Sequence, residues 1–386
     1  MELTNTVVLT LLIVLAYLVG VLCAVLALWR SRTPQGATAW VVGLISSPFV
    51  LLPLFVVFGR SKFQGYVHQR RELDKQARGK LPNAEQLRLL QTTPADKLFA
   101  IASLTDASSQ PGFTNTNDVE LLINAERAYP RMLEAIKTAK HSILFQFYIF
   151  REDAIGNEFA KLLMKKASEG VKVYFLCDNI GSRLNSKFIK KLEAHGISVR
   201  LFRSWKVWNS QVQVNFRNHR KVLVVDGSVA FVGGINIGDD YLGRCKDIGP
   251  WRDTHLRMTG PAALATQVSF TKDWYWVTGE IPDVSWTPHP TPSKGAEVLV
   301  LHTGPADEKE ICLLAHIALI NTAIRRVWIA TPYFVLPEGL ANALILASLR
   351  GVDVQVLLPS YSDSRLVMYA SEVYVEKLLA AGIKFS

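Results

Sequence analysis

Residues 218–236 of the chain read NHRKVLVVDGSVAFVGGIN. Two Val-rich runs flank the dipeptide Asp226-Gly227, which is a strong turn signal, so this stretch predicts a β-hairpin. Because side chains alternate between the two faces of a strand, His219 and Lys221 are expected on the same face. Asp226 lies at the turn, where it either anchors the hairpin through hydrogen bonds or contributes to a site beside the strand.

The residue types in this stretch suit attack on a phosphodiester, which is anionic and repels nucleophiles. A neutral imidazole such as that of His219 is a good nucleophile near pH 7, since its ordinary pKa is about 6.5. Covalent catalysis divides one difficult displacement into two easier ones. The ammonium of Lys221 can stabilise phosphate oxygens without a metal, and a second imidazolium can protonate the leaving alkoxide. Gly233 and Gly234 would let the backbone approach an anion closely, with Asn236 donating to a phosphate oxygen.

The spacing of these residues is His-x-Lys, four residues, Asp, six residues and Gly-Gly-x-Asn. This spacing resembles the HKD signature of the phospholipase D superfamily. The resemblance implies phosphodiester transfer through a phosphohistidine, which needs two such histidines. The alternative is a Val-rich hairpin with a satisfied histidine, and the trailing Gly-Gly-x-Asn argues against that reading.

The first 60 residues predict a membrane anchor. Thr6 to Trp29 is uncharged and predominantly apolar. As a helix, this stretch is long enough to cross a bilayer core of about 30 Å. A second apolar stretch covers residues 37–58 and contains Pro48 and Pro53, which transmembrane helices tolerate. We therefore expect a multi-pass protein with two transmembrane helices, at about residues 6–29 and 37–58. The alternative is a pair of buried core helices.

The charge of the chain favours an anionic surface or substrate. The net charge is +10, and residues 61–113 form a basic juxtamembrane linker suited to anionic membrane lipid. The positive-inside rule favours a cytoplasmic catalytic domain, although Arg30 and Arg32 in the loop between the two apolar stretches argue the other way. The four cysteines show no metal spacing, and neither a metal nor a cofactor is expected.

Beyond residue 113, strands alternate with helices, which predicts an α/β fold with a mostly parallel sheet. Strands are expected at residues 142–150, 170–178 and 196–202, with helices at 126–140, 157–169 and 186–195. The same order recurs after a Pro-rich linker at residues 281–296. Tyr148 and Tyr333, Gly170 and Gly351, and His195 and Ala381 are offset by 185, 181 and 186 residues. A near-constant offset indicates a duplication, with a first half at residues 114–280 and a second half at 297–386.

The repeat predicts where a second motif should fall. His219 plus the offset lies near position 404, beyond Ser386. The second half contains only His302 and His316, and neither is followed by x-Lys. We therefore expect a duplicated α/β/α sandwich whose second half is incomplete. Such a fragment would hold half an active site and show little turnover by itself.

Further segments resemble bacterial cardiolipin synthases of the phospholipase D type. They are the two apolar stretches, residues 117–122 (NDVELL), 331–335 (TPYFV) and 362–367 (SDSRLV). The resemblance implies that His219 is the nucleophile and that Lys221 binds phosphate with help from Asn236. It also implies that Asp253, within WRDTH at residues 251–255, orients the imidazole. A surface salt bridge is the alternative for Asp253, and Gln146 stands where relatives often carry glutamate.

The implied reaction joins two phosphatidylglycerol molecules at the bacterial inner membrane. One phosphatidyl group would pass to His219, glycerol would leave, and the hydroxyl of a second phosphatidylglycerol would then accept the phosphatidyl group to give cardiolipin. The alternatives are a phospholipase D-type hydrolase with water as the acceptor and a non-catalytic membrane protein derived from such an enzyme. The charge alone would also allow a nuclease, but the membrane anchor argues against it, so nucleic acid is not an expected partner.

Overall fold

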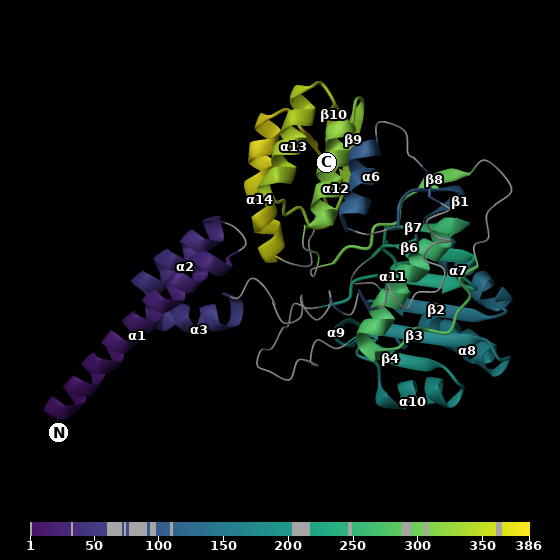
Figure 1. Cartoon of the computed structure of the whole chain (residues 1–386), viewed down its shortest axis with the longest axis horizontal. Helices are drawn as coiled ribbons and strands as arrows, with labels where there is room; N and C mark the ends of the chain where they lie inside the picture. The colour runs from purple at the N-terminus through teal and green to yellow at the C-terminus, as the bar shows by residue number, and fades with distance from the viewer. Residues whose placement is uncertain are drawn as a thin grey trace.

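The computed structural model describes most of the 386 residues. It describes residues 2–386 except 32–33, 60–71, 73–74, 77–90, 93–97, 109–110, 203–216, 246–248, 288–294, 305–306, 308 and 360–364. Figure 1 shows three parts, namely the amino-terminal helices α1–α3, a large α/β unit around α11, and a smaller unit formed by α12–α14 with strands β9 and β10. Most of the basic juxtamembrane linker lies outside the described residues.

Helix α1 (Glu2–Arg30) contains the candidate membrane span, Thr6–Trp29. At about 1.5 Å per residue, its 24 residues extend about 36 Å, enough to cross the apolar core of a bilayer. Most of its large apolar side chains are exposed, as expected for a surface that faces lipid. Within the described part of the chain, this is the one helix that is long and apolar enough to span a membrane.

The expectation of a second transmembrane helix is wrong. Residues 37–58 belong to two short helices, α2 (Pro34–Ser46) and α3 (Pro48–Phe58), of 13 and 11 residues. They extend about 20 Å and 16 Å, too short for a bilayer core of about 30 Å. The break falls at Ser47, whose φ of −143° and ψ of 65° are not helical, because the ring of Pro48 disfavours helical backbone in the preceding residue.

The two short helices instead pack against α1. Ala24 and Ala27 of α1 form a small apolar core with Leu44 of α2 and Phe55 of α3. The rings of Trp40 and Phe55 meet edge to face at 5.2 Å. The amino-terminal part is therefore one long helix with a folded-back pair, and the multi-pass prediction is not supported.

An eight-stranded mixed sheet forms the centre of the large unit, in the order β4-β3-β2-β5-β6-β7-β1-β8. The strands are β1 (Thr114–Ile123), β2 (Ser142–Phe147), β3 (Lys172–Asp178), β4 (Ser198–Phe202), β5 (Val222–Val225), β6 (Val229–Gly233), β7 (Thr254–Thr259) and β8 (Ala296–Val298). Strands β2, β3 and β4 are parallel, and the remaining pairs are antiparallel. The predicted α/β class is confirmed, with a larger antiparallel part than expected.

Helices cover both faces of this sheet. The helices α7 (Ala125–Thr138), α8 (Ala154–Ser168) and α10 (Ser186–Ala194) pack on one face around Phe145 and Phe175. Helix α11 (Pro261–Thr278) packs on the other face against Leu144, Leu176 and Val224. Every residue of β2 is buried, as expected for a strand covered on both faces.

The hairpin predicted from the opening motif is confirmed. Strands β5 and β6 pair from Val222 and Val232 to Val225 and Val229, and Asp226-Gly227 forms the turn. Asp226 and Gly227 both have positive φ, at 53° and 65°, which is the backbone of a type I′ hairpin turn. The hairpin lies in the middle of the sheet, where β5 joins the parallel strands to the antiparallel ones.

The smaller unit is a three-stranded parallel sheet with helices. Its strands are β9 (Arg326–Ala330), β10 (Asp353–Leu357) and β11 (Lys384–Phe385), in the order β11-β10-β9. Its helices are α12 (Ile311–Thr322), α13 (Glu338–Leu349) and α14 (Arg365–Ala380). The strand-helix order matches the prediction for residues 297–386. Residues 61–113 are predicted to be a linker, but within that range Phe99–Ser108 forms helix α6, which packs against α12.

Candidate active site

His219 and Lys221 lie just before β5, beside the carboxyl ends of β2 and β3. Lys221 is 5% exposed, whereas His219 is exposed. The Lys221 Nζ lies 3.0 Å from His219 Nδ1 and 3.3 Å from Nε2, and it donates to the His219 carbonyl at 2.7 Å. The structure therefore brings the two residues together on one side of the strand, as their spacing predicts.

Tyr148, directly after β2, forms one wall of the site. Its ring lies 4.6 Å from the His219 ring, and the Lys221 Nζ lies 5.3 Å from the Tyr148 centroid, a cation–π arrangement. Arg217 donates to the Tyr148 hydroxyl at 2.9 Å, which places an exposed guanidinium at the rim. The sequence predicts no role for Tyr148 in the site, and the structure adds it through this contact with His219.

The protonation states suit a nucleophile next to a cation. Burial lowers the pKa of Lys221 to about 8, and the negative charge of Asp253 acts in the opposite direction. Burial and then the charge of Lys221 lower the pKa of His219, against a smaller opposite effect of Asp178. Near pH 7 the histidine is therefore neutral and the lysine is mostly charged.

Asp226 lies at the far end of β5 from His219 and anchors the hairpin. Its carboxylate accepts hydrogen bonds from the backbone N–H groups of Lys140, His141 and Ser142, each at 2.8 Å. These residues lead into β2, so the carboxylate ties the hairpin turn to the start of the neighbouring strand. Of the two roles open from the sequence, the geometry favours the anchor.

Replacing Asp226 with alanine is expected to lower the free energy of unfolding by about 2–4 kcal/mol. Hydrogen bonds to charged groups contribute about 1.5–3 kcal/mol each, and part of that loss is regained from water. Asp226→Asn should lose less, because asparagine keeps one acceptor oxygen and tolerates the left-handed backbone. Urea denaturation of the purified chain measures both changes. An alanine variant as stable as the parent would contradict the anchor role.

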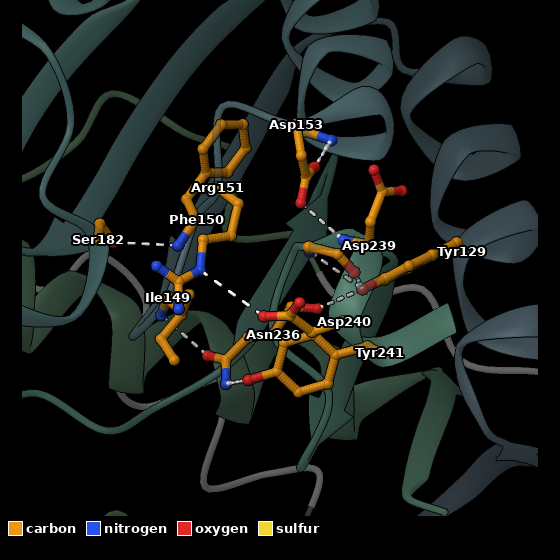
Figure 2. A network of polar contacts seen from close by, with 12 residues as sticks. Tyr129, Ile149, Phe150, Arg151, Asp153, Ser182, Asn236, Asp239, Asp240 and Tyr241 are labelled. Carbon is orange, nitrogen blue, oxygen red and sulfur yellow. Dashed lines mark hydrogen bonds and ion pairs between the residues drawn. The ribbon is translucent and has the colours of Figure 1, made fainter. Parts of the chain in front are cut away.

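Asn236 lies in a buried polar network beside the site (Figure 2). Its Oδ1 accepts from the Ile149 N–H at 2.9 Å, its Nδ2 donates to the Tyr241 hydroxyl at 2.6 Å, and its carbonyl accepts from the Tyr129 hydroxyl at 2.7 Å. Burial raises the pKa of Tyr241 to about 12, so this hydroxyl stays protonated. The network holds the segment after β6 against the segment after β2, and phosphate binding by Asn236 stays a prediction.

Gly233 and Gly234 allow the start of β7 to approach the hairpin closely. A Cβ on Gly233 would lie 2.5 Å from His255 Nδ1, and one on Gly234 would collide with the Asp253 carboxylate. The Gly234 N–H donates to the Thr254 carbonyl at 3.1 Å. The structure thus gives these glycines a packing role, whereas their predicted role in binding phosphate stays a prediction.

Asp253 lies close enough to influence Lys221 electrostatically. One carboxylate oxygen accepts from Trp251 Nε1 at 3.1 Å and the other from the Thr254 N–H at 2.7 Å. Its charge raises the pKa of Lys221, opposing the effect of burial. Asp253 therefore acts on Lys221 through its charge, and its orienting effect on the imidazole stays a prediction.

Two functional candidates were not found from the sequence. Asp178, the last residue of β3, caps the short helix α9 (Asn179–Ser182) and also accepts from the Asn218 N–H at 3.0 Å. His255 is fully buried and, among the described residues, its ring nitrogens have no hydrogen-bond partner. Burial and Lys221 lower the pKa of His255 to about 3, so it is neutral. An aspartate at the end of a buried strand was the available signal for Asp178.

Known proteins are similar to this chain in sequence and in fold. The family model described as "Cardiolipin synthase, PLD-like domain" matches residues 132–274 and 316–386. Cardiolipin synthase A of Pseudomonas aeruginosa (strain LESB58) is 41% identical over 99% of this chain and 78% of its own length. Cardiolipin synthase A of Pseudomonas entomophila (strain L48) is 38% identical over 97% of this chain and 78% of its own length. A solved phosphatidylserine synthase of Haemophilus influenzae Rd KW20 gives a TM-score of 0.48 at 15% identity, covering 68% of each chain.

Proposed function

The chain belongs to the family of phospholipase D-like cardiolipin synthases, and from that premise we propose that His219 is the nucleophile of a phosphatidyl transfer between two phosphatidylglycerol molecules. The observation that carries the proposal is the contact of the buried Lys221 ammonium with both ring nitrogens of the exposed His219. A neutral imidazole beside a fixed cation is the arrangement that attack on an anionic phosphodiester needs.

The first step forms a phosphatidyl-histidine. The imidazole of His219 attacks the phosphorus of phosphatidylglycerol, a phosphorus–nitrogen bond forms, and the phosphorus–oxygen bond to glycerol breaks. Lys221 stabilises the phosphate oxygens while charge develops on them. The glycerol oxygen takes a proton from a general acid as it leaves.

The second step completes the transfer. The terminal hydroxyl of a second phosphatidylglycerol gives its proton to the base that the general acid became in the first step, attacks the phosphorus and displaces the His219 nitrogen. The products are cardiolipin and the free imidazole. Cardiolipin formation and hydrolysis share the first step and differ only in whether a lipid hydroxyl or water attacks in the second.

The general acid comes from a second histidine in this proposal. His-x-Lys occurs once in the 386 residues. Strands β9, β10 and β11 are parallel neighbours in that order, as β2, β3 and β4 are, and this supports a duplication. We expect a second His-x-Lys, outside these 386 residues, to supply the acid. Because general acid catalysis contributes about 10²–10⁴-fold, residues 1–386 alone should turn over phosphatidylglycerol slowly.

The proposed location of the protein is the membrane that contains its substrates. Helix α1 would hold the catalytic unit at the bacterial inner membrane, where both phosphatidylglycerol substrates reside. The basic composition of residues 61–113 favours a cytoplasmic location and contact with anionic lipid headgroups. The proposed partners are therefore phospholipids and not nucleic acid.

The product ratio tests the acceptor. Residues 1–386 incubated for long times with labelled phosphatidylglycerol in mixed micelles are expected to give more cardiolipin than phosphatidic acid, because a transferase passes the phosphatidyl group to a lipid hydroxyl in preference to water. Thin-layer chromatography separates the two products, and His219→Asn should give neither. Phosphatidic acid without cardiolipin would replace the synthase proposal with a hydrolase.

A further inference from the structure

Asp273 of α11 is a buried carboxylate on which three side chains converge. It is 1% exposed. Its Oδ2 accepts from Gln146 Nε2 at 2.7 Å, from Asn218 Nδ2 at 2.8 Å and from Arg220 Nη1, with which it also forms an ion pair. The same helix contributes Ala262, Ala263, Phe270 and Trp274 to the apolar core.

Two of these three donors are the residues on either side of His219. Asn218 and Arg220 both reach the same oxygen of Asp273, and the Arg220 N–H also donates to Asn218 Oδ1 at 3.1 Å. The other guanidinium nitrogen of Arg220 donates to the Thr303 carbonyl at 2.7 Å. The chain is thus fixed immediately before and after the histidine, while the histidine ring itself stays exposed.

We propose that Asp273 is a positioning residue that sets the direction of the His219 imidazole by holding Asn218 and Arg220. The proposal rests on the proposed function, since it takes His219 as the nucleophile. Its physical basis is that small displacements of a reacting group are costly, with about 1 Å of misplacement costing about 10²-fold in rate. A buried ion pair is weak evidence for stability alone, so a role in geometry explains better why α11 carries a carboxylate here.

Gln146 offers a way to separate geometry from general stability. Its amide faces the Asp273 carboxylate across a single hydrogen bond, so exchanging the two functional groups keeps one carboxylate and one amide in the pair. In Gln146→Glu/Asp273→Asn the carboxylate moves to β2, and an acceptor for Asn218 and Arg220 remains nearby. Asp273→Asn alone keeps an acceptor oxygen but loses the charge that pairs with Arg220.

The test uses residues 1–386 and bis(p-nitrophenyl) phosphate. The attack of His219 releases p-nitrophenolate, which leaves without a proton, so the first step proceeds without the general acid. Asp273→Asn is expected to lower the rate constant of this burst about 30–100-fold with less than about twofold change in KM. The double variant is expected to recover to within about fivefold of the parent.

Gln267→Ala is the matched control on the same helix. Gln267 is fully buried, and its amide donates to the Ser285 carbonyl at 2.8 Å instead of to the histidine segment. The Gln267→Ala variant should have a lower melting temperature than the parent, and the burst rate constant of the folded protein should be unchanged. If Asp273→Asn does not fold, Asn218→Ala removes one contact without changing α11 and should slow the burst at unchanged KM.

The outcomes separate the two proposals. Equal rate losses in Asp273→Asn and Gln267→Ala, or a folded double variant without recovery, would overturn the positioning role. A parent chain with no burst and no adduct on His219 would overturn the proposed function itself. Both the proposed function and the positioning role are supported by three results together. The parent burst depends on His219, the burst is slower in Asp273→Asn, and the burst rate constant recovers in the double variant.

Discussion

His219→Asn is expected to abolish the burst of p-nitrophenolate, with a fall of about 10⁴-fold or more in the rate constant. Asparagine is close to histidine in size but has no nucleophilic nitrogen, so the covalent route is closed. Stopped-flow absorbance measures the burst, and mass spectrometry of the quenched chain locates the phosphoryl group on the peptide that contains residue 219. The parent chain should give at most one equivalent of p-nitrophenolate per active chain before any slower phase.

His195→Asn provides the matched control for this variant. His195 caps the end of α10 on the surface, with its Nδ1 at 2.8 Å from the Lys191 carbonyl. The His195→Asn variant makes the same chemical change away from the site and should leave the burst intact. An adduct that persists in His219→Asn would show that the nucleophile is another residue.

Lys221→Met is expected to lower the burst rate constant about 10²–10³-fold, since one fixed charge beside the phosphate oxygens is lost. The parent should show a rate that falls as pH rises through about 8, because the ammonium of Lys221 loses its proton there. The rate should rise with pH through a value below 6.5, where His219 becomes neutral. In Lys221→Met the falling limb near pH 8 should be absent.

The stability of Lys221→Met distinguishes lost chemistry from lost folding. Lys221 is charged at neutral pH in both the folded and the unfolded chain. Its pKa is about 8 in the folded protein and 10.5 in the unfolded chain, so folding disfavours the charged form. The penalty is about 3 kcal/mol below pH 8 and disappears as pH rises towards 10.5. Methionine removes it, so the variant should melt no lower than the parent at pH 7. A slow variant that is also much less stable would contradict this account.

The hairpin and the site pair could be predicted because their signals are local. Asp226-Gly227 has the backbone preference of a tight turn, and two-residue spacing places His219 and Lys221 on one side of a strand. The partners of Asp226 and Asp273 could not be predicted, because they lie far away in the sequence and meet only when the sheet forms. Asp226 binds the backbone at residues 140–142, and Asp273 of α11 binds Gln146 of β2.

The amino-terminal helices show a different limit of prediction from sequence. Hydropathy averages composition over a window, and by that measure residues 37–58 are apolar enough to span a bilayer. It does not register that Ser47 precedes a proline and leaves the helical region. Because of this single backbone break, the expected span forms two short helices.

The hairpin lies in the middle of the sheet, and this position limits how far the segment before β5 can move. Strand β5 pairs with β2 on one side and β6 on the other, so its amide hydrogens should exchange with solvent about as slowly as those of any strand in the protein. In the proposed reaction, the backbone next to such a strand keeps His219 fixed relative to the sheet. The phosphate of the lipid would therefore have to be brought to the histidine, since the histidine segment would not move out to meet it.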